Sequence, residues 1–306
     1  MPQSASPPLP KEMAVTRLFQ CPLTKGALEV RPLTPKDQSE VLAFLAARHV
    51  HTIIMASYIR DNGLLSSLNR GTFYACRDGR GRLQGVALIG HLTLIEARTR
   101  ATLEAFARLT QACPEARIVV TEPKKVKQFW RSYASPQQKK PHLVCRELLY
   151  EQQWPIEVRE AVSDLRLATL DDLERVVEVH AEVTLELKGM NPMLSDPQGF
   201  RLRCVRRIEQ GRVWVWFENG RLIFKADVIA ETPEVTYLEG IYVDPAQRGR
   251  GYGLRCFSQL SRILLQRSKA VCLLVSEQNR KAQAFYNKAG YKLHSYYDMI
   301  FLPESS

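Results

Sequence analysis

Hydrophobic and polar positions recur in the same order twice along the chain. A short alternating strand followed by a helical pattern begins at Leu28, and the same pair begins again at Leu165. Two strands joined by a Gly-containing turn begin at Gly71 and again at Gly211. In the second case the turn is Asn219-Gly220, a strong hairpin signal because both turn residues need a positive φ.

A buried strand followed by a helix comes next in each pattern, from Arg117 and from Val271. The matched points lie 137, 140 and 154 residues apart (165 − 28, 211 − 71 and 271 − 117), so the spacing is loose but the element order is the same. We therefore predict two copies of one mixed α/β domain, over residues 20–150 and 155–306. A disordered lead over residues 1–19, rich in Pro, Ser and Ala, precedes them.

Composition narrows the class of protein without choosing a function. The chain has 306 residues, of which 45% are hydrophobic and 25% charged, as is usual for globular domains. Its seven cysteines are scattered and form no C-x-x-C pair, so neither a zinc site nor a disulfide framework is indicated, and no metal is expected. No run of about 18 apolar residues is present and the start lacks a secretory apolar core, so we expect a cytoplasmic protein without a membrane span.

The charge of the chain is unevenly distributed. Residues 1–150 hold 22 basic and 11 acidic residues, and residues 151–306 hold 21 of each, so the first half carries the whole net charge of +11. This excess is typical either of a solvated face or of a surface for an acidic partner; no nucleic-acid motif accompanies it, so nucleic acid is not the expected partner. Its densest cluster comprises Lys124, Lys125, Lys127, Arg131, Lys139 and Lys140.

A glycine-rich loop in the second half, residues 247–253, lies between a strand and an amphipathic helix. Such a loop presents unpaired backbone N–H groups at the positive end of the helix dipole, which favours a phosphate. The loop lacks the G-K-[ST] of a nucleoside-triphosphate site. It also departs from the dinucleotide fingerprint, because position 254 is Leu and three strands precede it. A pyrophosphate loop of the type Q/R-x-x-G-x-G/A fits the sequence from Gln247 to Gly253.

Residues 165–302 resemble the GCN5-related N-acetyltransferase (GNAT) superfamily. The resemblance rests on the strand end Val243–Pro245, the loop 247–253 and the downstream motif from Asn279 to Tyr291, which begins about 25 residues after the loop. The whole chain further resembles bacterial two-domain members whose first half is a divergent acetyltransferase-like domain. The resemblance implies an α/β fold with a mixed sheet and tandem GNAT-like acyl-CoA N-acyltransferase domains.

This resemblance also implies acetyl-CoA as co-substrate and assigns its contacts. The loop would bind the pyrophosphate through backbone N–H groups, and Ile241–Val243 would pair with the pantetheine amides. The Val243 N–H would stabilise the oxyanion. Tyr286 matches the family's general acid, which protonates the leaving thiolate. The implied cofactor-binding residues are Ile241, Tyr242, Val243, Gln247, Arg248, Gly249, Arg250, Gly251, Tyr252, Gly253, Asn279 and Tyr286.

The general base is assigned to Glu239. It lies on the strand 237–243, and simple alternation places it on one face with Tyr237, Ile241 and Val243. A carboxylate in a central strand is costly to bury, which points to a role in deprotonating the amine through a water. The alternative is a partly exposed Glu paired with a basic neighbour. Other residues remain rival bases, namely Asp227, Glu277 and His180.

Two further segments bear on the acceptor. Residues 187–197 are turn-rich and apolar, and form either a wall of the acceptor site or a surface linker. In the first half, the corresponding stretch Val86–Ala101 contains no G-x-G, so we expect that half not to bind coenzyme A in the usual way. Its expected role is scaffold, acceptor binding or regulation.

The sequence thus predicts an N-acetyltransferase that moves the acetyl group of acetyl-CoA to a primary amine by direct transfer in a ternary complex. The acceptor is a small amine, an amino acid or a protein lysine, and the sequence does not choose among them. The alternatives are a non-catalytic acyl-CoA-binding sensor, or a protein that binds nucleic acid or an acidic partner through its basic first half.

Overall fold

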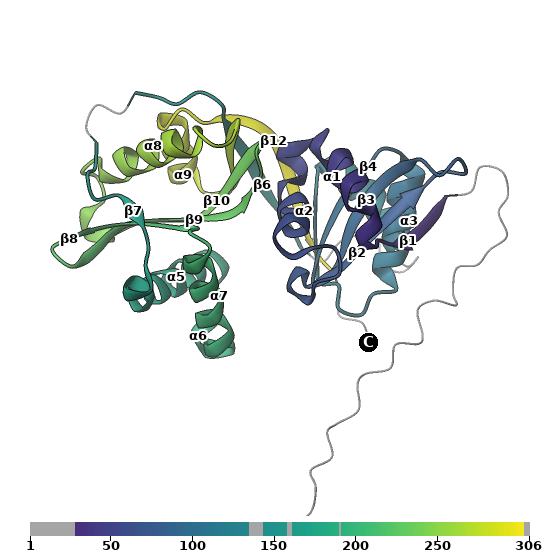
Figure 1. The fold of residues 1–306 in the computed structure, drawn as a ribbon, viewed down its shortest axis with the longest axis horizontal. Coiled ribbons are helices and arrows are strands. Elements are labelled where there is room, and N and C mark those ends of the chain that lie inside the picture. Colours follow the sequence, from purple (N-terminus) through teal and green to yellow (C-terminus); the bar gives the residue numbers. More distant parts are fainter. Residues whose placement is uncertain (1–27, 135–142, 158–160, 190, 303–306) are drawn as a thin grey trace, which may run out of the picture.

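The fold is described from a computed structural model of the chain, which covers residues 28–134, 143–157, 161–189 and 191–302 (Figure 1). The predicted lead over residues 1–19 lies outside these described residues. The described chain consists of one large mixed sheet with helices packed on both of its faces.

The first half alternates strands and helices in the order that the sequence pattern predicts. Its elements are β1 (Glu29–Pro32), η1 (Pro35–Asp37), α1 (Gln38–Ala46), α2 (His49–Asn62), η2 (Ser67–Asn69), β2 (Gly71–Arg77), β3 (Leu83–Gly90), β4 (Leu92–Ala97), α3 (Arg100–Gln111), β5 (Ile118–Thr121), α4 (Pro123–Tyr133) and β6 (Leu143–Gln152).

The second half follows the same order. Its elements are β7 (Arg166–Leu167), η3 (Leu170–Asp172), α5 (Leu173–Lys188), α6 (Pro192–Ser195), α7 (Pro197–Glu209), β8 (Val213–Glu218), β9 (Arg221–Glu231), β10 (Val235–Val243), η4 (Pro245–Gln247), α8 (Tyr252–Leu264), β11 (Ala270–Ser276), α9 (Arg280–Lys288) and β12 (Lys292–Phe301).

The two halves repeat each other down to a local ion pair. In the first strand of each half, an Arg bonds the Asp that ends the following 3-10 turn: Arg31 with Asp37 at 2.5 Å, and Arg166 with Asp172 at 2.6 Å. In each half that Asp also accepts a hydrogen bond from a Thr backbone N–H three residues earlier, which fixes the start of the helix. The prediction of two copies of a mixed α/β fold is confirmed.

The two copies exchange their last strands. The sheet has twelve strands in the order β1-β2-β3-β4-β5-β12-β6-β11-β10-β9-β8-β7. The last strand of the chain, β12, therefore lies beside β5 of the first half, while β6 lies beside β11 of the second. The strands β12 and β6 pair antiparallel with each other at the centre of the sheet. The domain boundaries 20–150 and 155–306 remain predictions. In space each half contributes its last strand to the sheet of the other.

The helices lie in two layers. Leu148 of β6 packs in the cluster under α8 and α9, whereas its neighbour Leu149 packs against Val50 and Ile53 of α2, so these helices cover opposite faces. On the α2 face, the first half also contacts the second, because Asp61 of α2 pairs with Arg212 at 2.7 Å. The helix α2 therefore covers the centre of the sheet, where the halves meet (Figure 1).

Candidate functional site

The parallel strands β10 and β11 separate halfway along their length. Their pairing covers Val235 to Leu238 only, although β10 continues to Val243. On its other side β10 stays paired with β9, where the Asp244 N–H donates to the Ile223 carbonyl at 2.9 Å. Because successive residues of a strand direct their N–H groups to opposite edges, the Val243 N–H points into the gap toward β11. This open strand edge is available to a peptide-like ligand.

A bulge at Gly240 separates the two ends of β10. Gly240 has φ +60°, and a Cβ there would lie 2.6 Å from Oδ2 of Asp227, so only glycine fits. The bulge shifts the register, and with it the face on which side chains lie: Tyr237 packs on the α2 side, whereas Ile241 and Val243 pack toward α8 and α9. Tyr237 shares a face with Glu239, as predicted, since its hydroxyl bonds the Glu239 carboxylate. The prediction that Ile241 and Val243 share this face is wrong, because simple alternation takes no account of the extra residue.

The glycine loop leads from β10 into α8. Gly249 and Gly251 have φ +80° and +83°, and Gly251 is the N-cap residue of α8. The backbone N–H groups of residues 249–254 have no hydrogen-bond partner among the described residues. A Cβ at Gly249 or Gly251 would meet no atom within 4 Å, so open space lies beside these donors. The loop thus combines a row of free donors with the positive end of a helix, an arrangement suited to an anion.

The side chains of the loop are divided between the interior and the solvent. Tyr252 turns inward and packs edge-to-face on Trp216 at 5.2 Å, and Oε1 of Gln247 is buried. Nε of Arg248 donates to the Val243 carbonyl at 3.1 Å. Arg250 is exposed and forms no ion pair with a described residue. Arg248 and Arg250 thus leave positive charge beside the free N–H groups.

Helix α9, which carries Tyr286, packs beside the first turn of α8, where a Cβ at Gly253 would lie 3.5 Å from Cε2 of Phe285. Asn279 caps α9, because its side chain accepts from the Ala282 N–H at 3.0 Å. Tyr286 packs among aromatic rings, with Phe257 at 5.6 Å and Tyr150 at 6.3 Å between ring centroids. Burial raises the pKa of Tyr286 to about 12, so its hydroxyl keeps its proton at neutral pH and can donate it.

Glu239 is exposed, as in the alternative that the sequence left open, but its partner is a phenol rather than a basic side chain. The physical reason is that the pairing of β10 with β11 ends at Leu238, so Glu239 faces the gap. Its carboxylate accepts a hydrogen bond from the Tyr237 hydroxyl at 2.8 Å. A solvent-accessible carboxylate held in place by a phenol is suited to accept a proton from an amine.

The rival bases lie in less suitable places. Asp227 is fully buried and bonds Nζ of Lys225 at 2.6 Å, and this cation holds the pKa of Asp227 well below its usual range. His180 lies 3.2 Å from the same carboxylate, and burial lowers its pKa. Glu277 is exposed beyond the end of β11. Only Glu239 combines access to solvent with a place in the gap.

Two residues of the first half approach this site, and sequence reasoning missed both. Glu147 of β6 is half-buried, and burial together with the charge of Glu239 raises its pKa to about 7. Burial raises the pKa of Tyr58 on α2, and the charge of Glu239 raises it further. The only sequence signal for Glu147 is an acidic residue within the apolar strand that ends the first half. The exchange of strands, which brings Glu147 here, has no signal in the sequence.

In the first half the equivalent gap is closed. There β4 and β5 pair only as far as Leu94, but the space beyond is occupied by ion pairs in which Arg48 bonds Glu96 and Glu122, each at 2.9 Å. The start of α3 is capped by Thr99, whose hydroxyl accepts from the Thr102 N–H. With its helix capped and its gap filled, this half has no counterpart of the glycine loop among its described residues.

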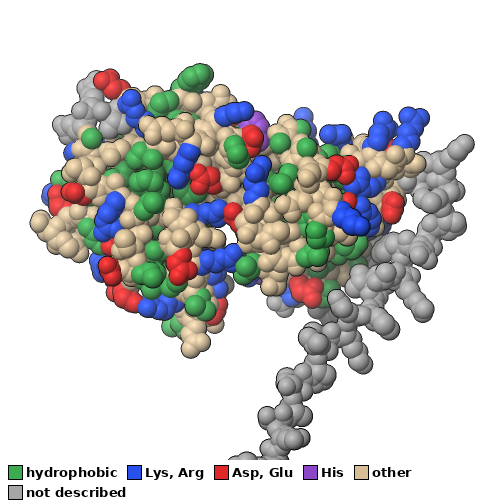
Figure 2. Space-filling view, in the orientation of Figure 1, with side chains coloured by type: hydrophobic (Ala, Val, Ile, Leu, Met, Phe, Trp, Pro, Cys, Tyr) green, Lys and Arg blue, Asp and Glu red, His purple; other side chains and the backbone are tan. Residues whose placement is uncertain are grey.

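The basic cluster of the first half is partly used within the fold. Lys125 pairs with Glu122 at 2.7 Å, whereas Lys124, Lys127 and Arg131 are exposed on α4. Lys139 and Lys140 lie outside the described residues. On the face shown in Figure 2, acidic side chains lie among the basic ones over both halves.

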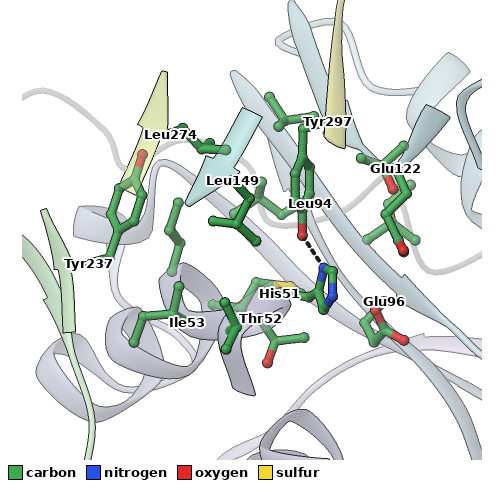
Figure 3. Close-up of a pocket in the computed structure, with 16 residues that line it drawn as sticks. His51, Thr52, Ile53, Leu94, Glu96, Glu122, Leu149, Tyr237, Leu274 and Tyr297 are labelled. Atoms are coloured by element: carbon green, nitrogen blue, oxygen red, sulfur yellow. Dashed lines mark hydrogen bonds between the residues drawn. The ribbon is translucent and has the colours of Figure 1, made fainter. Parts of the chain in front are cut away.

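The predicted acceptor segment 187–197 contains the short helix α6. Met193 and Leu194 of this helix are exposed, and Met190 lies outside the described residues. A separate cavity lies beneath α2, where Nδ1 of His51 meets the Tyr297 hydroxyl at 2.6 Å (Figure 3). Its volume of about 50 Å³ suits one or two water molecules rather than a substrate.

Neither a membrane span nor a metal cluster is found in the part of the chain that the structure describes. No helix there is long and apolar enough to cross a bilayer. Nor do three or more His, Cys, Asp or Glu side chains gather there in an arrangement that could hold a metal ion.

Comparison with known proteins points to one family. Residues 179–291 match the model of the acetyltransferase (GNAT) family. Among curated proteins no match was found.

Solved structures resemble the whole chain. A GNAT-family acetyltransferase from Colwellia psychrerythraea is 11% identical with a TM-score of 0.56, covering 90% of this chain and 100% of its own. A tandem GNAT protein from the clavulanic acid biosynthesis pathway is 14% identical with a TM-score of 0.56, covering 92% and 100%. A GCN5-related N-acetyltransferase from Sphaerobacter thermophilus is 14% identical with the same TM-score, covering 90% and 95%.

These likenesses establish a tandem fold over nearly the whole chain. The family match spans the strand gap, the glycine loop and Tyr286, which are the features that the geometry singles out. It leaves out the first half, whose gap is filled by ion pairs. The second half of this chain therefore contains a domain of the GNAT acetyltransferase family.

Proposed function

We propose that the second half transfers the acetyl group of acetyl-CoA to a primary amine by direct transfer in a ternary complex. The observation that carries this proposal is the gap between β10 and β11 joined to a glycine loop with free N–H groups. The gap suits the amide-bearing arm of the cofactor, and the loop suits its pyrophosphate. No other part of the described chain combines an open strand edge with an anion site.

The residues present fit the proposed co-substrate. Open space beside Gly249 and Gly251 lets phosphate oxygens approach the backbone donors. Gly253 is required for a different reason, because a Cβ there would lie 2.7 Å from Cγ2 of Val243. The helix start is thereby held directly against the end of β10, which keeps the loop and the open edge in one site.

The proposed reaction assigns each bond and proton to a group. The amine nitrogen attacks the thioester carbonyl carbon as its proton passes, through a water, to Glu239. The charge that develops on the acyl oxygen is stabilised by the Val243 N–H, which is already oriented into the gap. The carbon–sulfur bond then breaks, and the leaving thiolate takes the hydroxyl proton of Tyr286.

Replacing Gly251 by Ala should weaken acetyl-CoA binding by about tenfold or more. The residue's φ of +83° costs an L-residue about 1–2 kcal/mol, and the new methyl group projects into the space proposed for the pyrophosphate. Titration calorimetry with acetyl-CoA measures the change. Gly220→Ala is the matched control, because Gly220 has φ +74° and equally open surroundings but lies in the β8–β9 turn. Equal affinity in the two variants would exclude the loop as the pyrophosphate site.

Release of free thiol, measured over a panel of primary amines with acetyl-CoA as donor, tests the reaction itself. Acetyl transfer to at least one class of amine is expected. Tight acetyl-CoA binding without thiol release for any amine would instead support a non-catalytic sensor. If the chain neither bound acetyl-CoA nor released thiol with any amine, the proposed function would be excluded.

A further inference from the structure

The exchange of strands brings a carboxylate of the first half to the site of the second. Glu147 on β6 lies opposite Ser276 of β11 and Tyr297 of β12. It is two residues from Leu149, which lines the same cavity as Tyr237, so it lies on the α2 face of the sheet (Figure 3). Glu239 and the phenol that bonds it approach from this face, across β11.

The Glu147 carboxyl is not used by the fold. Its side chain is half-buried, yet it forms no hydrogen bond or ion pair with any residue that the structure describes. The other charged groups nearby on β6 and β12 are paired, for example Arg146 with Asp298 at 2.8 Å. A half-buried carboxyl without a partner is costly, and a cation placed between it and Glu239 would remove that cost.

The surroundings of this carboxyl pair are fixed by the first half. Helix α2, which carries Tyr58, is held on the second half by the Asp61–Arg212 ion pair and by a hydrogen bond from the Glu231 N–H to Ser57 at 3.2 Å. Tyr58 is half-buried, and burial together with the charge of Glu239 raises the pKa of its phenol, which therefore keeps its proton. The acceptor side of the gap is therefore composed of elements from both halves.

We propose that Glu147 and Glu239 together bind the ammonium group of the acceptor, so that the first half determines which amines the second half acetylates. This inference rests on the proposed function. The preferred acceptor class is a protonated primary amine without a carboxylate beside the nitrogen, such as an alkylamine, a diamine or a lysine side chain. A free α-amino acid is disfavoured, because its own carboxylate would meet the two glutamates.

Binding of an ammonium group should release the carboxyl proton of Glu147. In the free protein Glu147 titrates at about 7, so at neutral pH it is protonated in a large fraction of molecules. An ammonium group beside it favours the ionised form, and the carboxyl proton is released to solvent as the ion pair forms. Acceptor binding should therefore strengthen as the pH rises through about 7.

Other titrating groups on the α2 face of the sheet do not account for a change of acceptor binding near pH 7. The pKa of His51 is lowered to about 4, and those of Tyr58, Tyr237, Tyr297 and Cys272 are raised. His294 lies near His51 and bonds Glu151 at 2.8 Å. A Glu151→Gln variant therefore serves as control. Glu151 lies on β6, as Glu147 does, so this change alters the surroundings of His294 and leaves Glu147 in place.

The test compares pentylamine with norleucine, which has the same carbon chain with a carboxylate beside the amine. The wild-type chain should prefer pentylamine in kcat/KM, and Glu147→Gln should raise the KM for pentylamine by about ten- to hundredfold. The fall of KM with rising pH should disappear in Glu147→Gln and persist in Glu151→Gln. An unchanged KM and pH profile in Glu147→Gln would overturn the proposal.

A second measurement does not depend on turnover. The titration of Glu147, followed by NMR of labelled carboxyl carbons, should shift to lower pH when pentylammonium is added. No shift would overturn the proposal even if the chain acetylates amines. A shift without acetyl transfer to any amine would uphold the cation site and refute the proposed function.

Discussion

Replacing Tyr286 by Phe is expected to lower turnover by about 10²- to 10⁴-fold, the usual contribution of a general acid, with little change in acetyl-CoA binding. The ring contacts with Phe257 and Tyr150 are retained in the variant. The hydroxyl forms no hydrogen bond with a described residue, so its removal leaves no group unpaired. The loss should therefore fall on kcat, as measured by thiol release at saturating acetyl-CoA.

The neighbouring Tyr291 provides a matched control. It belongs to the same aromatic cluster, but its hydroxyl lies 2.8 Å from that of Ser261, deep in the core. Tyr291→Phe should cost about 1 kcal/mol of stability and leave turnover near the wild-type value. Unchanged turnover in Tyr286→Phe would exclude Tyr286 as the acid.

Because the pKa of Tyr286 is about 12, its ionisation should not limit turnover at any pH below about 11.

Replacing Lys225 by Met is expected to lower the free energy of unfolding by about 3–5 kcal/mol, because it leaves a buried carboxylate without its closest cation. Lys225 and Asp227 are both fully buried, with their charged atoms 2.6 Å apart. Arg207 and His180 remain near the carboxylate, at 3.3 and 3.2 Å, but each is partly exposed and more distant than Lys225. Urea denaturation at neutral pH measures the loss.

The double variant Lys225→Met with Asp227→Leu separates loss of charge from loss of packing. Removing both charges should restore much of the stability, since a buried ion pair is often replaced by apolar residues at little cost. If the double variant were less stable than Lys225→Met alone, the unpaired charge of Asp227 would not explain the loss of stability in Lys225→Met. The same pair lies against Gly240, so the double variant also tests whether the bulge needs the charges to keep its shape.

The sequence is sufficient to predict the features that local patterns encode. The repeated strand–helix order, the start of α8 at the glycine loop and its buried face were all predicted, because periodicity, glycine content and helix entry are local. The absence of such a loop in the first half was likewise visible, and Thr99 occupies the helix start there.

Features that depend on which strands lie side by side were not predicted. A strand with period-2 alternation does not specify its partner, so nothing indicated that β6 pairs with β11 and β12 with β5. Glu147 was missed for this reason. The reversal of face after Gly240 was missed because it follows from the bulge. Whether Glu239 is exposed was left open, because it depends on the early end of pairing at Leu238.

The exchanged strands also govern when this protein can fold during its synthesis. Phe301 pairs with Ile118, 183 residues earlier (301 − 118), so β5 and β6 have no strand between them until β12 has been synthesised. A nascent first half leaving the ribosome would have one unpaired edge on β5 and two on β6, and such edges attract chaperones or other strands. We expect residues 1–157 made alone to be insoluble, and to be recovered by co-expression with residues 158–306. Folding of the sheet would then be a single event that waits for the synthesis of β12.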